Sequence, residues 1–198
     1  MSYIILVILW LLFYFTHSYL AGLSIKQKIS SLLKSGYRWY RMFYSLLFGF
    51  FFFGILVYAA TLAKSQILAT TELLTYMGYM FATFGTIIIV KAFRNFSGFK
   101  FIGIRPHNDL QVTEPLVTSG IHAWMRHPVY TGLVLIFLGY FLFAPFLSSL
   151  IHLTCLLVYL PFGIYFEEKK LVSIYGEAYT AYKKSVSALI PFKKIKAT

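Results

Sequence analysis

Residues 127–166 read HPVYTGLVLIFLGYFLFAPFLSSLIHLTCLLVYLPFGIYF, which is 40 residues without a single Asp, Glu, Lys or Arg. As one helix, such a run would rise about 60 Å, twice the roughly 30 Å hydrocarbon thickness of a bilayer. The tripeptide Ala144-Pro145-Phe146 near its middle offers a turn, because proline interrupts a helix from within. We therefore expect a hairpin of two membrane spans, at about 128–144 and 147–166.

Three further apolar runs precede the hairpin, at residues 3–23, 42–63 and 73–90, and the last continues past Lys91 towards Phe96. Each run is long enough to cross a bilayer as a helix. Of the 198 residues, 59% are hydrophobic and only 12% are charged, against about a quarter in a soluble domain. These features predict an all-α membrane protein with about five transmembrane helices in one integral membrane domain, 1–198. Residues 1–96 would hold three spans and a basic connector, and residues 97–198 a polar loop, the hairpin and a C-terminal helix.

The positions of the basic residues predict how the chain is oriented. With five spans and the N-terminus outside, every Lys and Arg except Lys64 falls on the cytoplasmic side, in segments 24–41, 91–126 and 167–198. We therefore expect a cytoplasmic C-terminus, and the short loops suggest a prokaryotic inner membrane. The net charge of +12 lies between apolar runs and not on one soluble face, so the expected partner is the lipid bilayer and not nucleic acid.

Two polar segments have the periodicity of helices that lie along a membrane surface. In residues 24–41 the apolar positions recur at helical spacing among five basic side chains. Near the C-terminus, Tyr175, Tyr179, Tyr182 and Val186 fall on one helical face, which predicts an amphipathic helix. That helix would be either a tail that anchors the last span or a lid over a site.

A polar corner stands directly before the fourth span, where Arg126 and His127 precede Pro128. Proline suits the first turn of a helix, since its missing N–H has no partner there. The N–H groups that would then be free belong to Val129, Tyr130 and Thr131. With Arg126 and the helix dipole they would form an anion site. Alternatively, Arg126 and His127 reach the interface and bind lipid phosphate.

Two adjacent glutamates, Glu167 and Glu168, end the fifth span. Glu167 continues directly from the apolar run, so we expect it to face the protein, where it could accept hydrogen bonds from a ribose diol. Glu168 would face the protein or form an exposed ion pair with the lysines that follow. His122 and His127 are five residues apart, which does not match a helical metal pair, so we expect no metal.

These residues resemble a known family. The segment VTSGIHAWMRHPVYTG (117–132) looks like the signature of isoprenylcysteine carboxyl methyltransferases, and EEKKL (167–171), YGEAYTAY (175–182) and Ile190-Pro191 look like their C-terminal block. The resemblance covers about residues 95–192. The N-terminal part, with His17-Ser18 and YRWYR (37–41), is more similar to NnrU-type proteins and membrane thiol methyltransferases.

The resemblance implies S-adenosyl-L-methionine as methyl donor, bound on the cytoplasmic side, with S-adenosyl-L-homocysteine as product. Carried over by position, the residues that would line the cofactor pocket are His107, Leu116, Val117, His122, His127, Pro128, Tyr130 and Glu167. The donor is already activated, so such a site mainly supplies proximity, alignment and a dry pocket. Arg126 and Glu168 are the candidate catalytic side chains, and Glu168 or His127 would serve as base if the acceptor loses a proton.

The chain departs from the family pattern at two positions. His122 stands where the family usually has Tyr, and Gly163 stands where prenylcysteine enzymes have an Arg for the substrate carboxylate. The second change favours a neutral lipophilic or small thiol acceptor over a prenylcysteine. Two alternatives stay open: a phospholipid N-methyltransferase, and a non-catalytic NnrU-like protein that binds a partner or conducts protons through His17.

Overall fold

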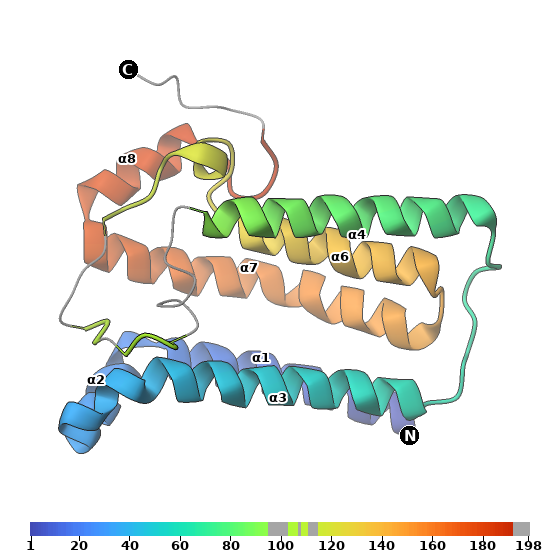
Figure 1. The fold of residues 1–198 in the computed structure, drawn as a ribbon, viewed down its shortest axis with the longest axis horizontal. Helices are drawn as coiled ribbons and strands as arrows, with labels where there is room; N and C mark the ends of the chain where they lie inside the picture. The colour runs from blue at the N-terminus through green and yellow to red at the C-terminus, as the bar shows by residue number, and fades with distance from the viewer. Residues whose placement is uncertain (95–102, 107, 111–114, 192–198) are drawn as a thin grey trace. The chain divides into compact units, whose positions relative to one another are not determined.

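The structure is a computed structural model that describes residues 1–94, 103–106, 108–110 and 115–191. Its described part is built from helices and connecting loops, and the chain divides into two compact units. Unit 1 holds residues 1–62 and 96–115, and unit 2 holds residues 63–95 and 116–198. Figure 1 shows the order of the helices along the chain.

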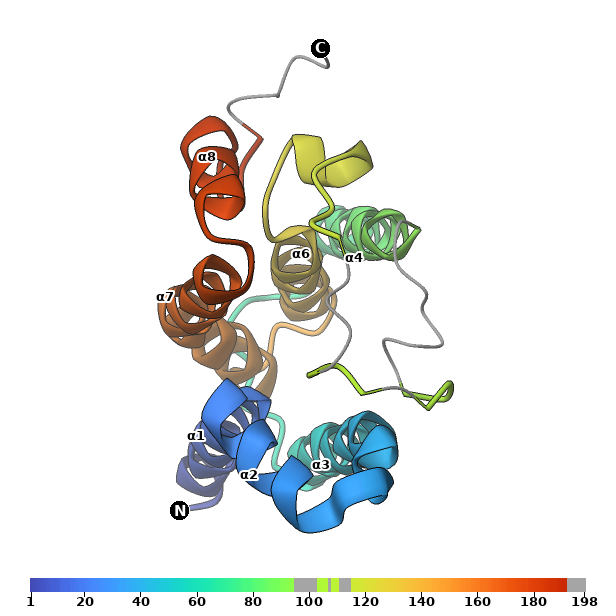
Figure 2. The same cartoon turned by 90° about the vertical axis from the view of Figure 1, so that its left-hand side faces the viewer.

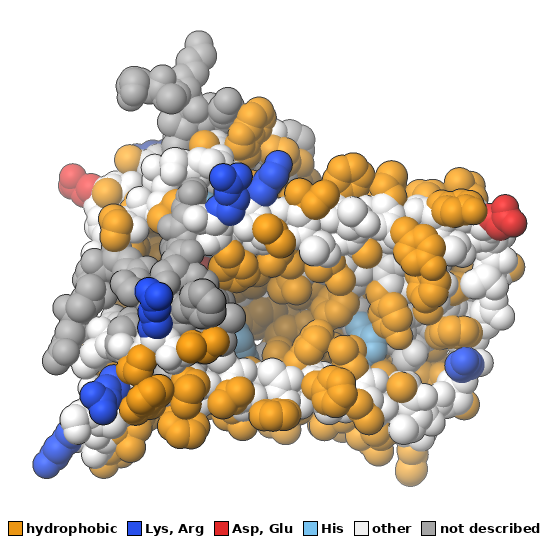
Figure 3. Space-filling view, viewed as in Figure 1, with side chains coloured by type: hydrophobic (Ala, Val, Ile, Leu, Met, Phe, Trp, Pro, Cys, Tyr) orange, Lys and Arg blue, Asp and Glu red, His pale blue; other side chains and the backbone are white. Residues whose placement is uncertain are grey.

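Unit 1 contains α1 (Ser2–Ala21), α2 (Leu23–Leu33), the 3-10 helix η1 (Lys34–Trp39) and α3 (Tyr40–Thr61). Aromatic rings join α1 to α3: Trp10 lies 5.9 Å from Phe52 and Phe13 lies 5.6 Å from Phe48, measured between ring centroids. The predicted helix in the basic connector is confirmed as α2, which η1 follows. Figure 3 shows hydrophobic side chains along the long helices and Lys and Arg side chains gathered near α2.

Unit 2 contains α4 (Glu72–Phe93), the 3-10 helix η2 (Gly120–Ala123), α6 (Pro128–Phe143), α7 (Leu147–Tyr175) and α8 (Glu177–Ser185). Viewed nearly end on, α6 lies between α4 and α7 (Figure 2). The α4–α6 contact depends on glycine. A Cβ on Gly85 would lie 2.5 Å from the Gly132 carbonyl oxygen, and one on Gly78 would lie 2.8 Å from that of Gly139. Only glycine allows the two backbones this close an approach.

The predicted hairpin is confirmed, with its turn at Ala144, Pro145 and Phe146 between α6 and α7. The connector before α4 secures that turn, because Ile67 N–H donates to the Pro145 carbonyl (2.8 Å) and Leu147 N–H donates to that of Ser65 (2.8 Å). The third run is α4, which passes Lys91 and ends at Phe93; Phe96 lies outside the described residues.

The helix that carries the last predicted span extends beyond that span. The α7 helix does not stop near Phe166 but continues through both glutamates to Tyr175. Charged residues mark where a membrane span ends, but Glu and Lys are good helix formers, so the helix itself continues. The residues predicted to form one C-terminal helix belong to two helices, because Gly176 takes a positive φ of 57° between α7 and α8. Tyr175 therefore ends α7, while Tyr179 and Tyr182 belong to α8.

Among the residues that the structure describes, four helical segments are long and apolar enough to cross a membrane: Ser2–Ala21, Leu23–Thr61, Glu72–Phe93 and Leu147–Tyr175. The fifth candidate, α6, is apolar but has only 16 residues. The protein is thus an all-α integral membrane protein with four or five helices that can span. The orientation and the single-domain organisation of residues 1–198 stay predictions.

Candidate active site

The α6 helix begins as the sequence predicted, with His127 at the N-cap and Pro128 in the first turn. Pro128 and His127 are both buried. The Thr131 N–H is not free, contrary to the prediction. It donates to the His127 carbonyl at 3.2 Å, which is the first hydrogen bond of the helix. The open helix start is therefore limited to the turn that holds Val129 and Tyr130.

The segment after α8 runs alongside the start of α6, which the sequence did not indicate. Arg126 N–H donates to the Ser187 carbonyl and His127 N–H donates to the Ala188 carbonyl, both at 2.9 Å. The Thr131 hydroxyl donates to the Leu189 carbonyl, also at 2.9 Å. These bonds join positions about 60 residues apart, so no local pattern could reveal them. They hold the chain after α8 against the polar corner.

Glu168 is the centre of the site. Its side chain is 6% exposed, and its Oε1 accepts from Arg126 Nε at 2.8 Å and from Arg126 Nη2 at 2.6 Å. Lys183 Nζ of α8 lies 2.6 Å from its Oε2, and His127 Nε2 lies 3.2 Å from its Oε1. A buried carboxylate is tolerated only when cations and hydrogen-bond donors satisfy its oxygens, and here three side chains do so.

Arg126 is not open towards an anion, contrary to expectation. Besides Glu168, its guanidinium donates to the carbonyl oxygens of Lys183 (3.1 Å) and Val186. Most of its donors are therefore used within the protein, and the side chain is 9% exposed. Arg126 thus ties α6, α7 and the segment after α8 together.

Of the two alternatives for Glu168, the structure shows the one in which it faces the protein, whereas Glu167 is more exposed than expected. Glu168 is the buried carboxylate, whereas the Glu167 side chain is 44% exposed. The buried positions of α7 run from Ser149 to Gly163 and resume at Glu168, so the buried face leaves out Glu167. Glu167 still contributes, since its Oε2 lies 3.5 Å from His127 Nδ1. Each ring nitrogen of His127 therefore faces a carboxylate, and the Tyr130 side chain also interacts with Glu167.

His122 is a buried connection between elements. Its Nε2 lies 3.4 Å from the Ala92 carbonyl at the end of α4, and its own carbonyl accepts from the Tyr182 hydroxyl at 2.6 Å. Burial lowers the pKa of His122 below its usual value and raises the pKa of Tyr182 to about 12. Both side chains are consequently neutral at pH 7. They link α4, η2 and α8, which encloses the site from that side.

Of the three remaining predicted residues, the structure describes Leu116 and Val117. Leu116 packs against the core formed by Tyr179, Tyr182 and Val186, and Val117 is half-buried. His107 lies outside the described residues. In the part of the chain that the structure describes, no group of three His, Cys, Asp or Glu side chains is placed to hold a metal.

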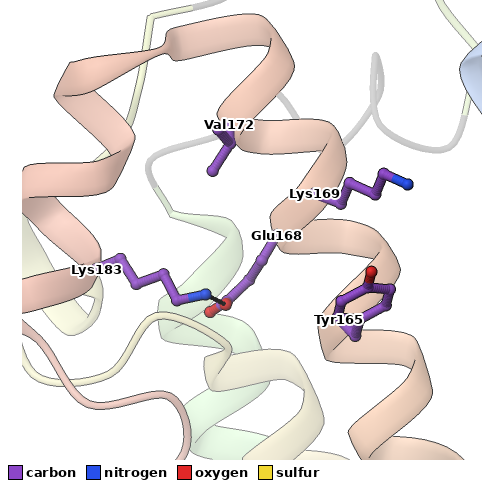
Figure 4. A pocket seen from close by; sticks show the side chains of 5 residues that line it. All are labelled: Tyr165, Glu168, Lys169, Val172 and Lys183. Carbon is purple, nitrogen blue, oxygen red and sulfur yellow. Dashed lines mark ion pairs between the residues drawn. The ribbon is translucent and has the colours of Figure 1, made fainter.

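A pocket opens beside Glu168, lined by Tyr165, Lys169 and Val172 of α7 and by Lys183 of α8 (Figure 4). Its volume is about 190 Å³. That is less than the roughly 300 Å³ at which small-molecule sites begin, so the pocket accommodates a headgroup and not a whole nucleoside. The sequence did not predict Lys169 or Lys183 as residues of the site.

Comparison with known proteins identifies this region. Residues 73–178 match the phospholipid methyltransferase family, PEMT. A protein-S-isoprenylcysteine O-methyltransferase of Schizosaccharomyces pombe is 40% identical over 77 residues, which cover 38% of this chain and 33% of the relative. The methanethiol S-methyltransferase 1 of Bradyrhizobium diazoefficiens is 32% identical over 79 residues (39% of this chain, 26% of the relative).

A methanethiol S-methyltransferase of Pseudomonas deceptionensis is 32% identical over 117 residues (53% of this chain, 41% of the relative). The matched segments thus span well under half the length of these relatives, and no solved structure matches. The family match covers more than half of the chain and includes the α6 start, Arg126, His127 and both glutamates. This protein therefore belongs to the phospholipid methyltransferase family.

Proposed function

We propose that the protein is an S-adenosyl-L-methionine-dependent integral membrane methyltransferase that acts on a lipophilic or thiol acceptor. One observation carries the proposal: Glu168 is buried among Arg126, His127 and Lys183 where two apolar helices meet, inside the region that matches the family. Such a polar cluster costs stability that apolar packing would not, and here it adjoins a half-exposed carboxylate and an open helix start, which favours a functional role.

The available donors and acceptors suit the polar parts of S-adenosyl-L-methionine. Its ribose diol and ammonium need an acceptor, and Glu167 offers a half-exposed carboxylate. Its carboxylate needs a positive environment, and the first turn of α6 supplies the positive end of a 16-residue helix dipole. Its adenine needs apolar walls, which Leu116 and Val117 would provide at the entrance. When bound, the cofactor supplies an activated methyl group.

In this scheme the protein's own residues divide into two roles. Arg126 and Glu168 position the others, since their donors and acceptors are already used within the cluster. His127 holds its ring between Glu167 and Glu168 and is the better placed base for a thiol acceptor, through Nδ1 on the half-exposed Glu167 side. An amine or thiol that approaches this nitrogen would lose its proton there as it gains the methyl group.

The test is equilibrium binding of radiolabelled S-adenosyl-L-methionine to the purified protein in detergent, followed by transfer assays with a small thiol and with a prenylcysteine analogue. Wild type should bind, Glu167→Ala should weaken binding at least tenfold, and His127→Ala should lose transfer to the thiol. Lys64→Ala, in the connector before α4, serves as a matched control and should match wild type. Absence of binding, or binding unchanged in both site variants, would contradict the proposal.

A phospholipid acceptor is the second candidate, and the family match over residues 73–178 favours it. It predicts mono- and dimethylated ethanolamine lipids in cells that express the protein, which lipid mass spectrometry would detect. Transfer to a thiol with no change in these lipids would exclude it. For either acceptor we place the site at the cytoplasmic face of a prokaryotic inner membrane. A C-terminal reporter active only outside the cytoplasm should stay silent.

A further inference from the structure

The outer face of α7 carries a continuous stripe of exposed side chains that ends at the pocket beside Glu168. Val158, Phe162 and Tyr165 are 58%, 61% and 60% exposed, and Lys169 and Val172 continue the same stripe. Their spacing alternates between four and three residues, so all five fall within one narrow arc of the helix. Val158, Phe162 and Tyr165 belong to the apolar part of the span, and Lys169 and Val172 line the pocket.

The upper end of this stripe is positively charged. Lys169 is exposed and has no ion-pair or hydrogen-bond partner among the residues that the structure describes. In Figure 4 its ammonium group points away from Glu168, whereas Lys183 points towards it. Lys183 is paired with Glu168 on one side but remains 49% exposed on the other. The pocket thus combines an apolar floor with two ammonium groups at its rim.

We propose that this stripe and pocket bind an anionic membrane lipid, with a hydrocarbon chain along Val158, Phe162 and Tyr165 and the phosphate at Lys169 and Lys183. Basic pockets at the membrane surface hold lipid headgroups in this way, and an apolar stripe within the span suits the attached chain. The pocket volume of about 190 Å³ fits a headgroup. A soluble anion would gain nothing from the stripe, and a zwitterionic lipid would gain less from the lysines because its own cation offsets its phosphate.

This lipid site is joined to the proposed methyl-transfer site through one carboxylate. Glu168 Oε2 faces Lys183 and the pocket, while Oε1 faces Arg126 and His127. A lipid phosphate that draws Lys183 away would leave Glu168 to Arg126 and His127 alone. Lipid binding itself requires neither the methyl donor nor turnover, so it can be measured without relying on the proposed function.

The experiment measures the lipid retained by the full-length protein after gel filtration in detergent, with no methyl donor present. The protein is first mixed with equal amounts of phosphatidylglycerol and phosphatidylcholine, and the retained lipid is quantified by mass spectrometry. Wild type should retain phosphatidylglycerol preferentially. Lys169→Gln should lower its retention roughly fivefold, the usual effect of one lysine at an anionic surface, and Tyr165→Ala should lower retention of both lipids.

Lys184→Gln is the matched control, since it removes the same charge from the residue beside Lys183 without touching the pocket. Its retention should equal that of wild type. An equal loss in Lys184→Gln and Lys169→Gln would show general charge attraction and overturn the proposal. Displacement of the lipid by millimolar inorganic phosphate would mean that the site binds a free anion and would overturn it as well. The separate donor-binding assay distinguishes the two proposals. Wild type that binds no labelled S-adenosyl-L-methionine but still retains the lipid would contradict the proposed function and leave the lipid site standing.

Discussion

Among the residues that the structure describes, two acids lie among cations, the half-buried Asp109 in unit 1 and the buried Glu168 in unit 2, and they differ in what surrounds them. Asp109 accepts from Lys26 and, at 2.9 Å, from the Tyr37 hydroxyl, and it lies 3.7 Å from Arg41 Nη1. The partners of Asp109 are all protein side chains, and two of them, Lys26 and Tyr37, are buried. Glu168 has a comparable set of partners, but a half-exposed carboxylate, a helix start and a pocket adjoin it.

A buried ion pair is therefore not by itself a sign of a functional site. The Asp109 cluster fastens residues 108–110 to α2 and η1, and all of its charges are used in doing so. The Glu168 cluster performs the same fastening for α8 but leaves Glu167 and the pocket side of Lys183 accessible. Loss of Asp109 should therefore affect stability alone, and loss of Glu168 should affect both stability and binding.

The largest effect is expected for Glu168→Gln. Removing the charge leaves Arg126 buried without its counter-ion, which costs about 3–5 kcal/mol in comparable buried pairs. Donor binding should weaken at least tenfold, because His127 loses its support. Thermal unfolding in detergent and equilibrium binding of labelled donor measure the two effects. Glu177→Gln, at an exposed acid of α8, should change neither. A stable Glu168→Gln variant with normal binding would remove Glu168 from the centre of the site.

Asp109→Asn should cost less, about 1–3 kcal/mol, because the carboxylate is 19% exposed and Tyr37 can still donate to the amide oxygen. Where the variant is folded, its donor affinity should match that of wild type. The same two measurements compare it directly with Glu168→Gln. A tenfold loss of donor affinity in folded Asp109→Asn would erase the distinction between the clusters.

Acid should remove the contribution of Asp109 progressively. Burial alone would raise its pKa, but Lys26, Tyr37 and Arg41 outweigh burial and hold the pKa below its ordinary value. With the folded-state pKa depressed, the stabilisation is present above the unfolded-state pKa of about 4 and is lost as the pH falls through the folded-state value. Wild type and Asp109→Asn should thus differ in melting temperature at pH 7, and the difference should shrink as the pH falls below about 4. A difference that stays constant from pH 7 down through the acid range would count against this charge-based origin.

The smallest effect is expected for Lys183→Met. Its ammonium is 49% exposed, so the pair with Glu168 contributes under about 1 kcal/mol. Lys26→Met should cost more, since Lys26 is 10% exposed and Asp109 keeps its charge. The melting temperatures of the two variants test this order. A larger decrease in melting temperature for Lys183→Met than for Lys26→Met would contradict the difference in burial between the two lysines.

The sequence revealed those features that hydropathy and local chemistry determine. The charge-free run with its Ala144-Pro145-Phe146 turn predicted the hairpin, and Pro128 predicted the first turn of α6. Arg126, His127 and both glutamates were identified as neighbours, and the structure brings them together. Their roles in binding and catalysis stay predictions.

Features that depend on distant partners could not be predicted in this way. Which of Glu167 and Glu168 is buried depends on contacts with Arg126 and Lys183, which lie elsewhere in the chain. The pairing of Arg126 and His127 with Ser187 and Ala188 has no local signature. The partners of Asp109 have no local signature either, since Lys26 and Tyr37 lie 83 and 72 residues away from it in the sequence.

The glycine contacts between α4 and α6 have a consequence for the bilayer itself. The 16 residues of α6 rise about 24 Å, roughly 6 Å less than the hydrocarbon layer, whereas the 22 residues of α4 rise about 33 Å. Because the two backbones are in contact, α6 cannot slide or tilt independently to correct the mismatch. If α6 spans, we expect the membrane to thin locally around it. Headgroups and water would then lie closer to Pro128, where the proposed polar donor and lipid-soluble acceptor would meet at one depth.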